Sequence, residues 1–247
     1  MFRILLACTL VLPCMAGGLS KSDKKEIKKM LDGTLYARVD MPCATGRHAY
    51  GTYKRPLVEV SPTGINTEAD TVVSASWYHA DSTYWGVSVN QPLKMDDLDI
   101  DDDGIEIELE GTDDEDIQTV IMFVDVDNME QFKACLDKAF SRVPLQDEHS
   151  DWPADIKAAI ANRKLVNGMT KKQAFCVTGR PVSFTKRTEG GKDVEVWDLR
   201  TNKGVKMGYF TTSVHESTGL PSQIKFVNGT LTNVAETGSG SDFSLDD

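Results

Sequence analysis

The period of the hydrophobic positions divides the chain near residue 125. Before that point, short runs that alternate or are rich in Val, Ile, Tyr and Trp predict β-strands. These runs are residues 35–39, 57–60, 71–78, 84–89, 105–110 and 120–124. Clusters of Pro, Gly and Asn separate several of them, which is typical of turns. We therefore expect a first region that is rich in β-structure.

Apolar residues at helical spacing follow this region. They are Met129, Phe132, Cys135, Leu136, Ala139 and Phe140. Residues three and four apart share one face of a helix, so residues 129–141 predict a helix whose apolar side packs on the preceding strands. Residues 25–143 then form a β-rich domain closed by one helix.

Residues 144–153 predict a linker, because they are polar and include two prolines. A helix follows from about Pro153, and Gly168 ends it. Its apolar stripe comprises Ile156, Ala159 and Ile160. Thr170 is a suitable N-cap for a second helix, which Gly179 ends. The second region therefore opens with two short helices.

Five more runs after these helices predict strands. They are residues 182–185, 194–199, 205–211, 222–227 and 230–234. Asn228-Gly229 between the last two predicts a tight hairpin. Residues 152–234 therefore form a second domain, and residues 235–247 predict a flexible acidic tail. The expected class of the whole chain is α+β.

Four short motifs in the second region occur in an order and at a spacing that resemble one family. They are Gly168-Met169-Thr170-Lys171-Lys172-Gln173, Gly179-Arg180-Pro181, Glu195-Val196-Trp197-Asp198-Leu199 and Phe226-Val227-Asn228-Gly229-Thr230-Leu231. On these residues the segment resembles the BamE-like (SmpA/OmlA) domain family. Two features depart from the family pattern: Val177-Thr178 replaces a Leu-Leu pair, and the loop over residues 205–220 is long.

The resemblance implies a two-layer domain, with two helices on an antiparallel sheet, in the bacterial envelope. Domains of this family are scaffolds in outer-membrane protein assembly, and a related architecture inhibits β-lactamases through its concave sheet face. The resemblance therefore implies contact with a protein partner, without naming the partner. We recognise no family for residues 25–143.

The motif residues also have structural roles that follow from their chemistry. Thr170 can cap its helix while Met169 packs behind it. Gly179 can adopt a left-handed conformation, and Pro181 prevents the helix from continuing. Trp197 is suited to anchor the sheet against the helices. None of these roles requires a catalytic group.

Residues 1–18 have the order of a secretory signal peptide. Arg3 precedes the apolar residues 4–15, and Ala16-Gly17-Gly18 resembles a cleavage region. The apolar run is too short to span a bilayer. We expect a cleaved periplasmic or secreted protein. The alternative is attachment to the outer membrane through a lipidated Cys8 or Cys14, although Pro13 before Cys14 is unfavourable.

The formal charge of −11 argues against binding to nucleic acids and to anionic lipids, which need basic surfaces. Three cysteines follow the signal peptide: Cys43, Cys135 and Cys176. They allow at most one internal disulfide, so hydrophobic cores must stabilise the fold.

Residues 99–110 allow two interpretations. Asp99, Asp101, Asp103, Gly104 and Glu110 match the spacing of a calcium-binding loop. However, residues 105–110 alternate as a strand, whereas such a loop lies between two helices. An acidic hairpin turn is the other interpretation. The acidic run at residues 113–116 is typical of a solvated surface.

Cys43 could act as a nucleophile with His48 or His79, but no nucleophile signature surrounds it. We expect no enzyme, cofactor or metal site. The segment with Arg47, His48, Tyr50 and Tyr53 is polar, aromatic and glycine-containing, and predicts an exposed loop that contacts a partner.

These patterns together predict an exported, non-catalytic binding or scaffold protein of the bacterial envelope, linked to outer-membrane assembly or maintenance. The expected partner is an envelope protein. We expect the chain to bind no nucleic acid and to contain no transmembrane span. The alternatives are a secreted inhibitor of another enzyme and a cysteine-dependent hydrolase that uses Cys43.

Overall fold

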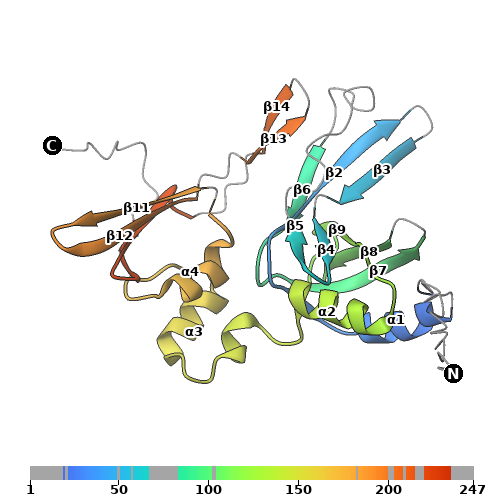
Figure 1. Ribbon diagram of the computed structural model, residues 1–247, viewed down its shortest axis with the longest axis horizontal. Coiled ribbons are helices and arrows are strands. Elements are labelled where there is room, and N and C mark those ends of the chain that lie inside the picture. The colour runs from blue at the N-terminus through green and yellow to red at the C-terminus, as the bar shows by residue number, and fades with distance from the viewer. Residues whose placement is uncertain are drawn as a thin grey trace, which may run out of the picture.

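The structure is a computed structural model (Figure 1). It describes residues 19, 22–48, 51–56, 58–66, 83–101, 104–181, 183–199, 203–207, 210–214 and 220–234. The predicted signal peptide, the predicted strand at residues 71–78 and the predicted tail lie outside these ranges.

Helices and sheets are mixed in the described part of the chain, which confirms the α+β class. The helices are α1 (Asp23–Leu31), α2 (Met129–Ala139), α3 (Ala154–Ala161) and α4 (Lys171–Thr178), with a 3-10 helix, η1 (Leu145–Glu148). Buried apolar side chains form two separate clusters. One lies mainly within residues 27–140 and the other mainly within residues 145–231.

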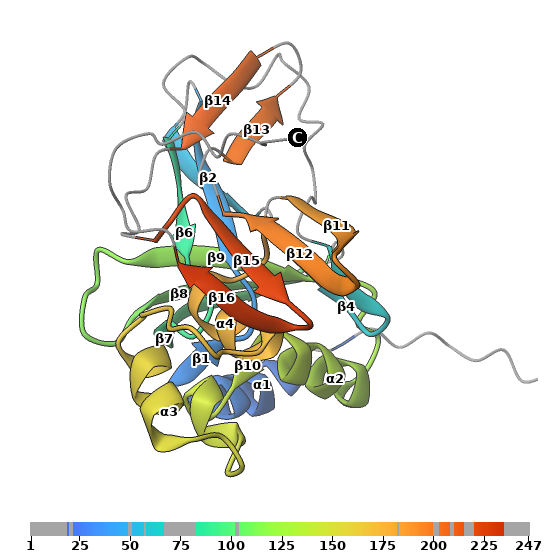
Figure 2. The same cartoon turned by 90° about the vertical axis from the view of Figure 1, so that its left-hand side faces the viewer.

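The first cluster fills the space between a seven-stranded sheet and two helices. In spatial order the strands are β10 (Phe140–Ser141), β1 (Leu35–Ala37), β7 (Pro92–Ile100), β8 (Ile105–Gly111), β9 (Gln118–Phe123), β4 (Glu59–Ser61) and β5 (Gly64–Asn66). Neighbouring strands are antiparallel except β4 and β9, which are parallel. Figures 1 and 2 show α1 and α2 on the same side of this sheet.

The expectation of one closing helix is wrong, because α1 and α2 both pack on this sheet. Ile27 and Leu31 of α1 are fully buried, as are Phe132 and Cys135 of α2. Helix α1 contains four lysines among its nine residues, so its apolar stripe is too short to stand out in the sequence. The hydrophobic pattern also does not predict strand β7, because its acidic residues are unfavourable in strands and interrupt the alternation of apolar and polar positions.

A second, smaller sheet lies against β9. Its strands are β2 (Met41–His48), β3 (Gly51–Pro56) and β6 (Thr83–Val87), with β2 in the centre. A separate hairpin consists of β13 (Lys203–Met207) and β14 (Phe210–Val214). The buried hydroxyl of Thr119 donates to the carbonyl of Met41 at 2.7 Å, which joins the two sheets through β9 and β2.

The second cluster lies under a four-stranded antiparallel sheet. Its strands, in spatial order, are β11 (Ser183–Glu189), β12 (Lys192–Asp198), β15 (Gln223–Val227) and β16 (Thr230–Val234). Helices α3 and α4 contribute Ile156, Ile160, Ala174 and Val177 to this core. The rings of Trp197 and Phe226 pack at a centroid distance of 4.7 Å. Trp197 is therefore an anchor of this sheet, as predicted.

Local signals at both ends of α4 act as expected. Thr170 and Gln173 form a complete capping box at its start. Gly179 ends it with φ +67°, a conformation that costs glycine little. Asn228 and Gly229 both have positive φ in the turn between β15 and β16, as a tight hairpin requires. These signals are local, so the sequence alone could indicate them.

Residues 144–153 differ from the predicted polar linker. They contain η1, in which Leu145 and Gln146 are buried. Leu145 belongs to the second hydrophobic cluster, and so does Val89 from the first half of the chain. The amide of Asn90 donates to Gln146 Oε1 at 2.9 Å. This connection is therefore packed against both halves, and the boundaries of the two proposed domains remain a prediction.

Candidate functional site

Three of the four residues predicted to contact a partner lie in paired β-strands rather than in a loop. Arg47 and His48 end β2, and Tyr53 lies in β3. Strand pairing places Arg47 opposite Thr52 and His48 opposite Gly51. Tyr50 and the side chains of the other three lie outside what the structure describes. Their role in binding stays a prediction.

Residues 104–110 continue into strand β8 rather than into a loop between two helices, which contradicts the calcium-loop geometry and agrees with a hairpin, while Asp103 lies outside the described residues. Ile100 pairs with Ile105 next to the turn. Glu110 lies five residues further along β8, about 17 Å from Ile105 at ~3.3 Å per residue. There it forms an ion pair with Lys94 of β7 at 3.0 Å.

The three cysteines among the described residues are buried thiols that form no disulfide with one another. Cys43 of β2 is fully buried, so its sulfur is not accessible to a substrate. Burial raises the pKa of Cys135 and of Cys176 to about 11, which keeps both thiols protonated at neutral pH. In the described ranges, no three His, Cys, Asp or Glu side chains are grouped to hold a metal ion.

The C-terminal sheet has an open edge at β11. All seven of its residues are exposed, and Phe184, at 55%, is the most exposed large apolar side chain among the described residues. Figure 2 shows β11 at one edge of this sheet, next to β12. The Nζ atom of Lys186 lies 5.0 Å from the centre of the Phe184 ring, a cation–π arrangement.

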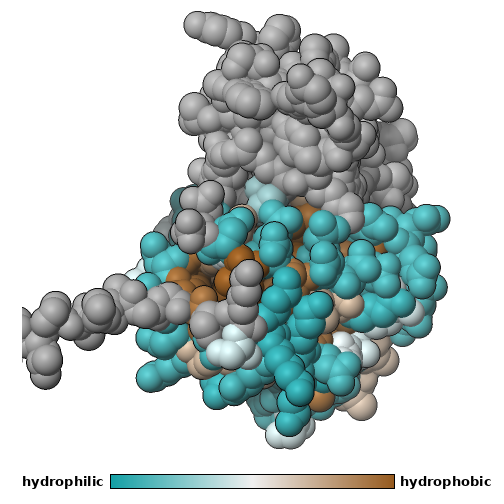
Figure 3. Space-filling view, turned by 90° about the vertical axis from the view of Figure 1, so that its right-hand side faces the viewer, coloured by the Kyte–Doolittle hydropathy of each residue, from teal (hydrophilic) through white to brown (hydrophobic). Residues whose placement is uncertain are grey.

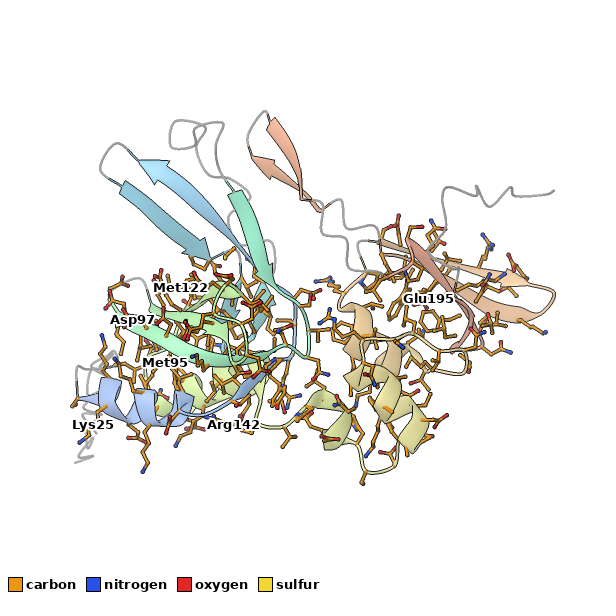
Figure 4. The ribbon with its side chains drawn as sticks, turned by 180° about the vertical axis from the view of Figure 1, so that it is seen from behind. Lys25, Met95, Asp97, Met122, Arg142 and Glu195 are labelled. Atoms are coloured by element: carbon orange, nitrogen blue, oxygen red, sulfur yellow. The ribbon has the colours of Figure 1, made fainter. Side chains whose placement is uncertain are left out.

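Glu195 lies behind this edge on β12, directly opposite Lys186 (Figure 4). The indole of Trp197 donates to Glu195 Oε1 at 2.7 Å, and Lys171 of α4 donates to Oε2 at 2.9 Å. Lys186 lies 3.7 Å from the same oxygen. Burial acts to raise the pKa of Glu195, but the hydrogen bonds from Trp197 and Lys171 outweigh it and hold this pKa below its ordinary value. The Glu195 carboxylate thus connects helix α4, strand β12 and the edge strand β11.

The other face of the sheet carries a second group of charges. Arg187 and Glu189 of β11 form an ion pair, and Lys225 of β15 lies 3.1 Å from Glu189. The hydrogen bond from Lys225, together with that from Arg187, lowers the pKa of Glu189 against the opposing effect of burial. Basic side chains are therefore present on both faces of the sheet near β11.

The net charge of the whole chain conceals an uneven distribution of charged residues along the sequence. Residues 154–234 contain 13 Lys and Arg against 6 Asp and Glu, whereas residues 1–153 contain 14 against 28. The region that holds β11 is therefore basic although the chain is acidic. Figure 3 shows the opposite side of the molecule, where hydrophilic residues cover much of the described surface. Charge totals by region would have indicated this asymmetry.

A comparison of the chain with protein-family models, curated proteins and solved structures found no match among any of the three. None of the helices in the described residues has both the length and the apolar content needed to cross a membrane.

Proposed function

We propose that this chain is a non-catalytic binding protein that holds a protein partner through its C-terminal sheet. The observation that carries the proposal is β11, an edge strand exposed over its full length. The backbone of such an edge offers unpaired donors and acceptors to an extended segment of another protein. The burial of Cys43 supports a role without nucleophilic catalysis.

The cellular setting that we propose is the bacterial envelope. It rests on the signal-peptide pattern of residues 1–18 and on the resemblance of residues 165–234 to BamE-like domains. In this setting the chain is a scaffold linked to outer-membrane assembly or maintenance. A secreted inhibitor of another enzyme is the second candidate, since the exposed edge of the C-terminal sheet could bind an enzyme as well as it could bind a scaffold partner.

Crosslinking in intact cells, followed by purification of the tagged full chain, tests this function. We expect one envelope protein to co-purify in near-stoichiometric amounts. Fractionation then separates the two candidates, because a scaffold stays with the outer membrane and an inhibitor is released. Turnover of a small molecule by the purified chain, with loss of activity in a folded Cys43→Ser variant, would overturn the proposal in favour of a hydrolase.

A further inference from the structure

The two edges of the C-terminal sheet differ in how well they are protected. Strand β16 pairs with β15 through a register shift between Lys225 and Phe226, which is a bulge that twists an edge. Strand β11 pairs with β12 in unbroken register from Ser183 to Glu189 and contains no proline. Natural edge strands are commonly shortened, bulged or covered. Of these two edges, β11 is therefore the one prepared to receive another strand.

The side chains of β11 determine which strand would fit. Lys186 and Arg187 are adjacent, so they lie on opposite faces of the sheet, and their side chains are 65% and 44% exposed. A strand beside β11 would place its residues directly opposite them, where acidic side chains are favoured and basic ones are not. Phe184, two residues before Lys186, favours an apolar neighbour on its own face.

A second copy of the chain is a poor occupant of this edge. Two β11 strands paired antiparallel about their central residue would place Lys186 of one copy directly opposite Lys186 of the other. Like charges directly opposite each other destabilise a strand pair. Lysine on an edge strand opposes self-association in this way while leaving the backbone free for an acidic strand.

We propose that β11 accepts an extended acidic segment of a partner protein as a fifth strand of the C-terminal sheet. The backbone of β11 supplies the hydrogen bonds, Lys186 and Arg187 select the acidic residues, and Phe184 packs against an apolar one. This inference rests on the proposed binding function and specifies the chemistry of the partner and its mode of binding.

The test measures binding of a labelled, end-blocked octapeptide, Thr-Val-Thr-Asp-Asp-Thr-Val-Thr, to the full chain. Its sequence reads the same in both directions, so it fits β11 whether the pairing is parallel or antiparallel. We expect saturable binding that weakens as salt rises. The control peptide with Asn-Asn in the centre should bind at least tenfold more weakly, and the Lys186→Gln and Arg187→Gln variants should each lose about two- to fivefold. Lys192→Gln removes a charge from β12 instead and should bind as the wild type does.

Two proline variants test strand pairing without changing charge. Thr185 and Thr188 are both exposed. Backbone N–H groups along a strand point alternately to its two sides, and these residues are three positions apart. One therefore directs its N–H towards β12 and the other towards the open edge. Proline at the inward position should lower the melting temperature. Proline at the outward position should leave the melting temperature unchanged, since edge strands tolerate it there, and should abolish peptide binding.

Several results would overturn the inference. Equal binding of the Asp and Asn peptides would exclude selection of acidic residues, and peptide binding that survives both proline substitutions would exclude strand pairing. A dimer that dissociates on either proline substitution would assign the edge to a second copy of the chain. A tenfold gain in peptide affinity on removal of residues 235–247 would assign the edge to the chain's own tail. If the peptide fails while a partner still co-purifies from cells, the binding function stands and only this mode of binding is wrong.

Discussion

The carboxylate of Asp40 lies directly against the backbone of Gly179, so that a β-carbon at residue 179 would overlap both of its oxygens. Asp40 Oδ1 accepts the N–H of Val89 at 3.0 Å, and Oδ2 accepts the N–H of Arg180 at 3.3 Å. A residue just before β2 thus accepts a hydrogen bond from the second residue after α4. The glycine at this helix end is needed for this close approach as well as for its positive φ.

Gly179→Ala should destabilise the protein more than glycine conformation alone explains. At φ +67° and ψ −157° the backbone of Gly179 lies in a region essentially restricted to glycine, which costs other residues about 1–3 kcal/mol, and displacement of Asp40 adds to that cost. Gly190→Ala is the control for replacing a glycine at positive φ, because Gly190 has φ +55° and open space around it. Urea unfolding of both variants measures the difference. Equal losses would show that the contact with Asp40 contributes nothing.

The pKa of Glu195 predicts a loss of stability in acid. Its folded pKa lies below the ordinary value of 4.5, so the folded state binds this proton less readily than the unfolded state does. Its stabilising contribution is therefore present above pH 4.5 and is lost as pH falls through the folded pKa. Glu195→Gln should flatten the fall in urea midpoint between pH 6 and pH 3 relative to the wild-type protein. Identical slopes in wild type and Glu195→Gln would contradict the assignment.

Trp197→Ala should cost about 3–5 kcal/mol, because it empties the space beside Phe226. The wild-type protein and a Phe184→Ala variant provide the comparison, since Phe184 lies on the same sheet but is exposed and should lose less than ~1 kcal/mol. Thermal unfolding followed by far-ultraviolet circular dichroism measures the stability of both variants.

If the second region is an independent domain, Trp197→Ala should unfold that region at a lower temperature while residues 25–143 keep their own unfolding transition. One shared transition would show that the two regions unfold together.

The burial of Leu145 predicts where a stable C-terminal fragment must begin. A fragment of residues 143–234 retains η1 and its apolar contact, whereas residues 152–234 leave that part of the core uncovered. We expect the longer fragment to melt at a higher temperature. Leu145→Ala in the longer fragment should remove most of this difference. A shorter fragment of equal stability would mean that the packing of η1 is not needed.

Features that depend on neighbouring residues were predictable from the sequence. Helix α4 lies close to its predicted start at Thr170 and ends at Gly179, because caps and left-handed glycines act within a few residues. The turn at Asn228-Gly229 is local for the same reason. The strict alternation of residues 105–110 likewise indicated β8 and its buried face.

Features that depend on partners far along the chain were decided by the tertiary structure. Strand β7 forms despite its acidic residues because β1 and β8 supply its hydrogen bonds. Val89 lies in the core of the second region, and Asp40 bonds at the end of α4, although no local pattern links them. The openness of β11 has the same origin: its sequence predicts a strand, but only the order of strands in the sheet places it at an unprotected edge. By itself the sequence determined caps, turns and alternation, because these interactions are short in range, while pairing and packing over long separations decided which surface is left for a partner.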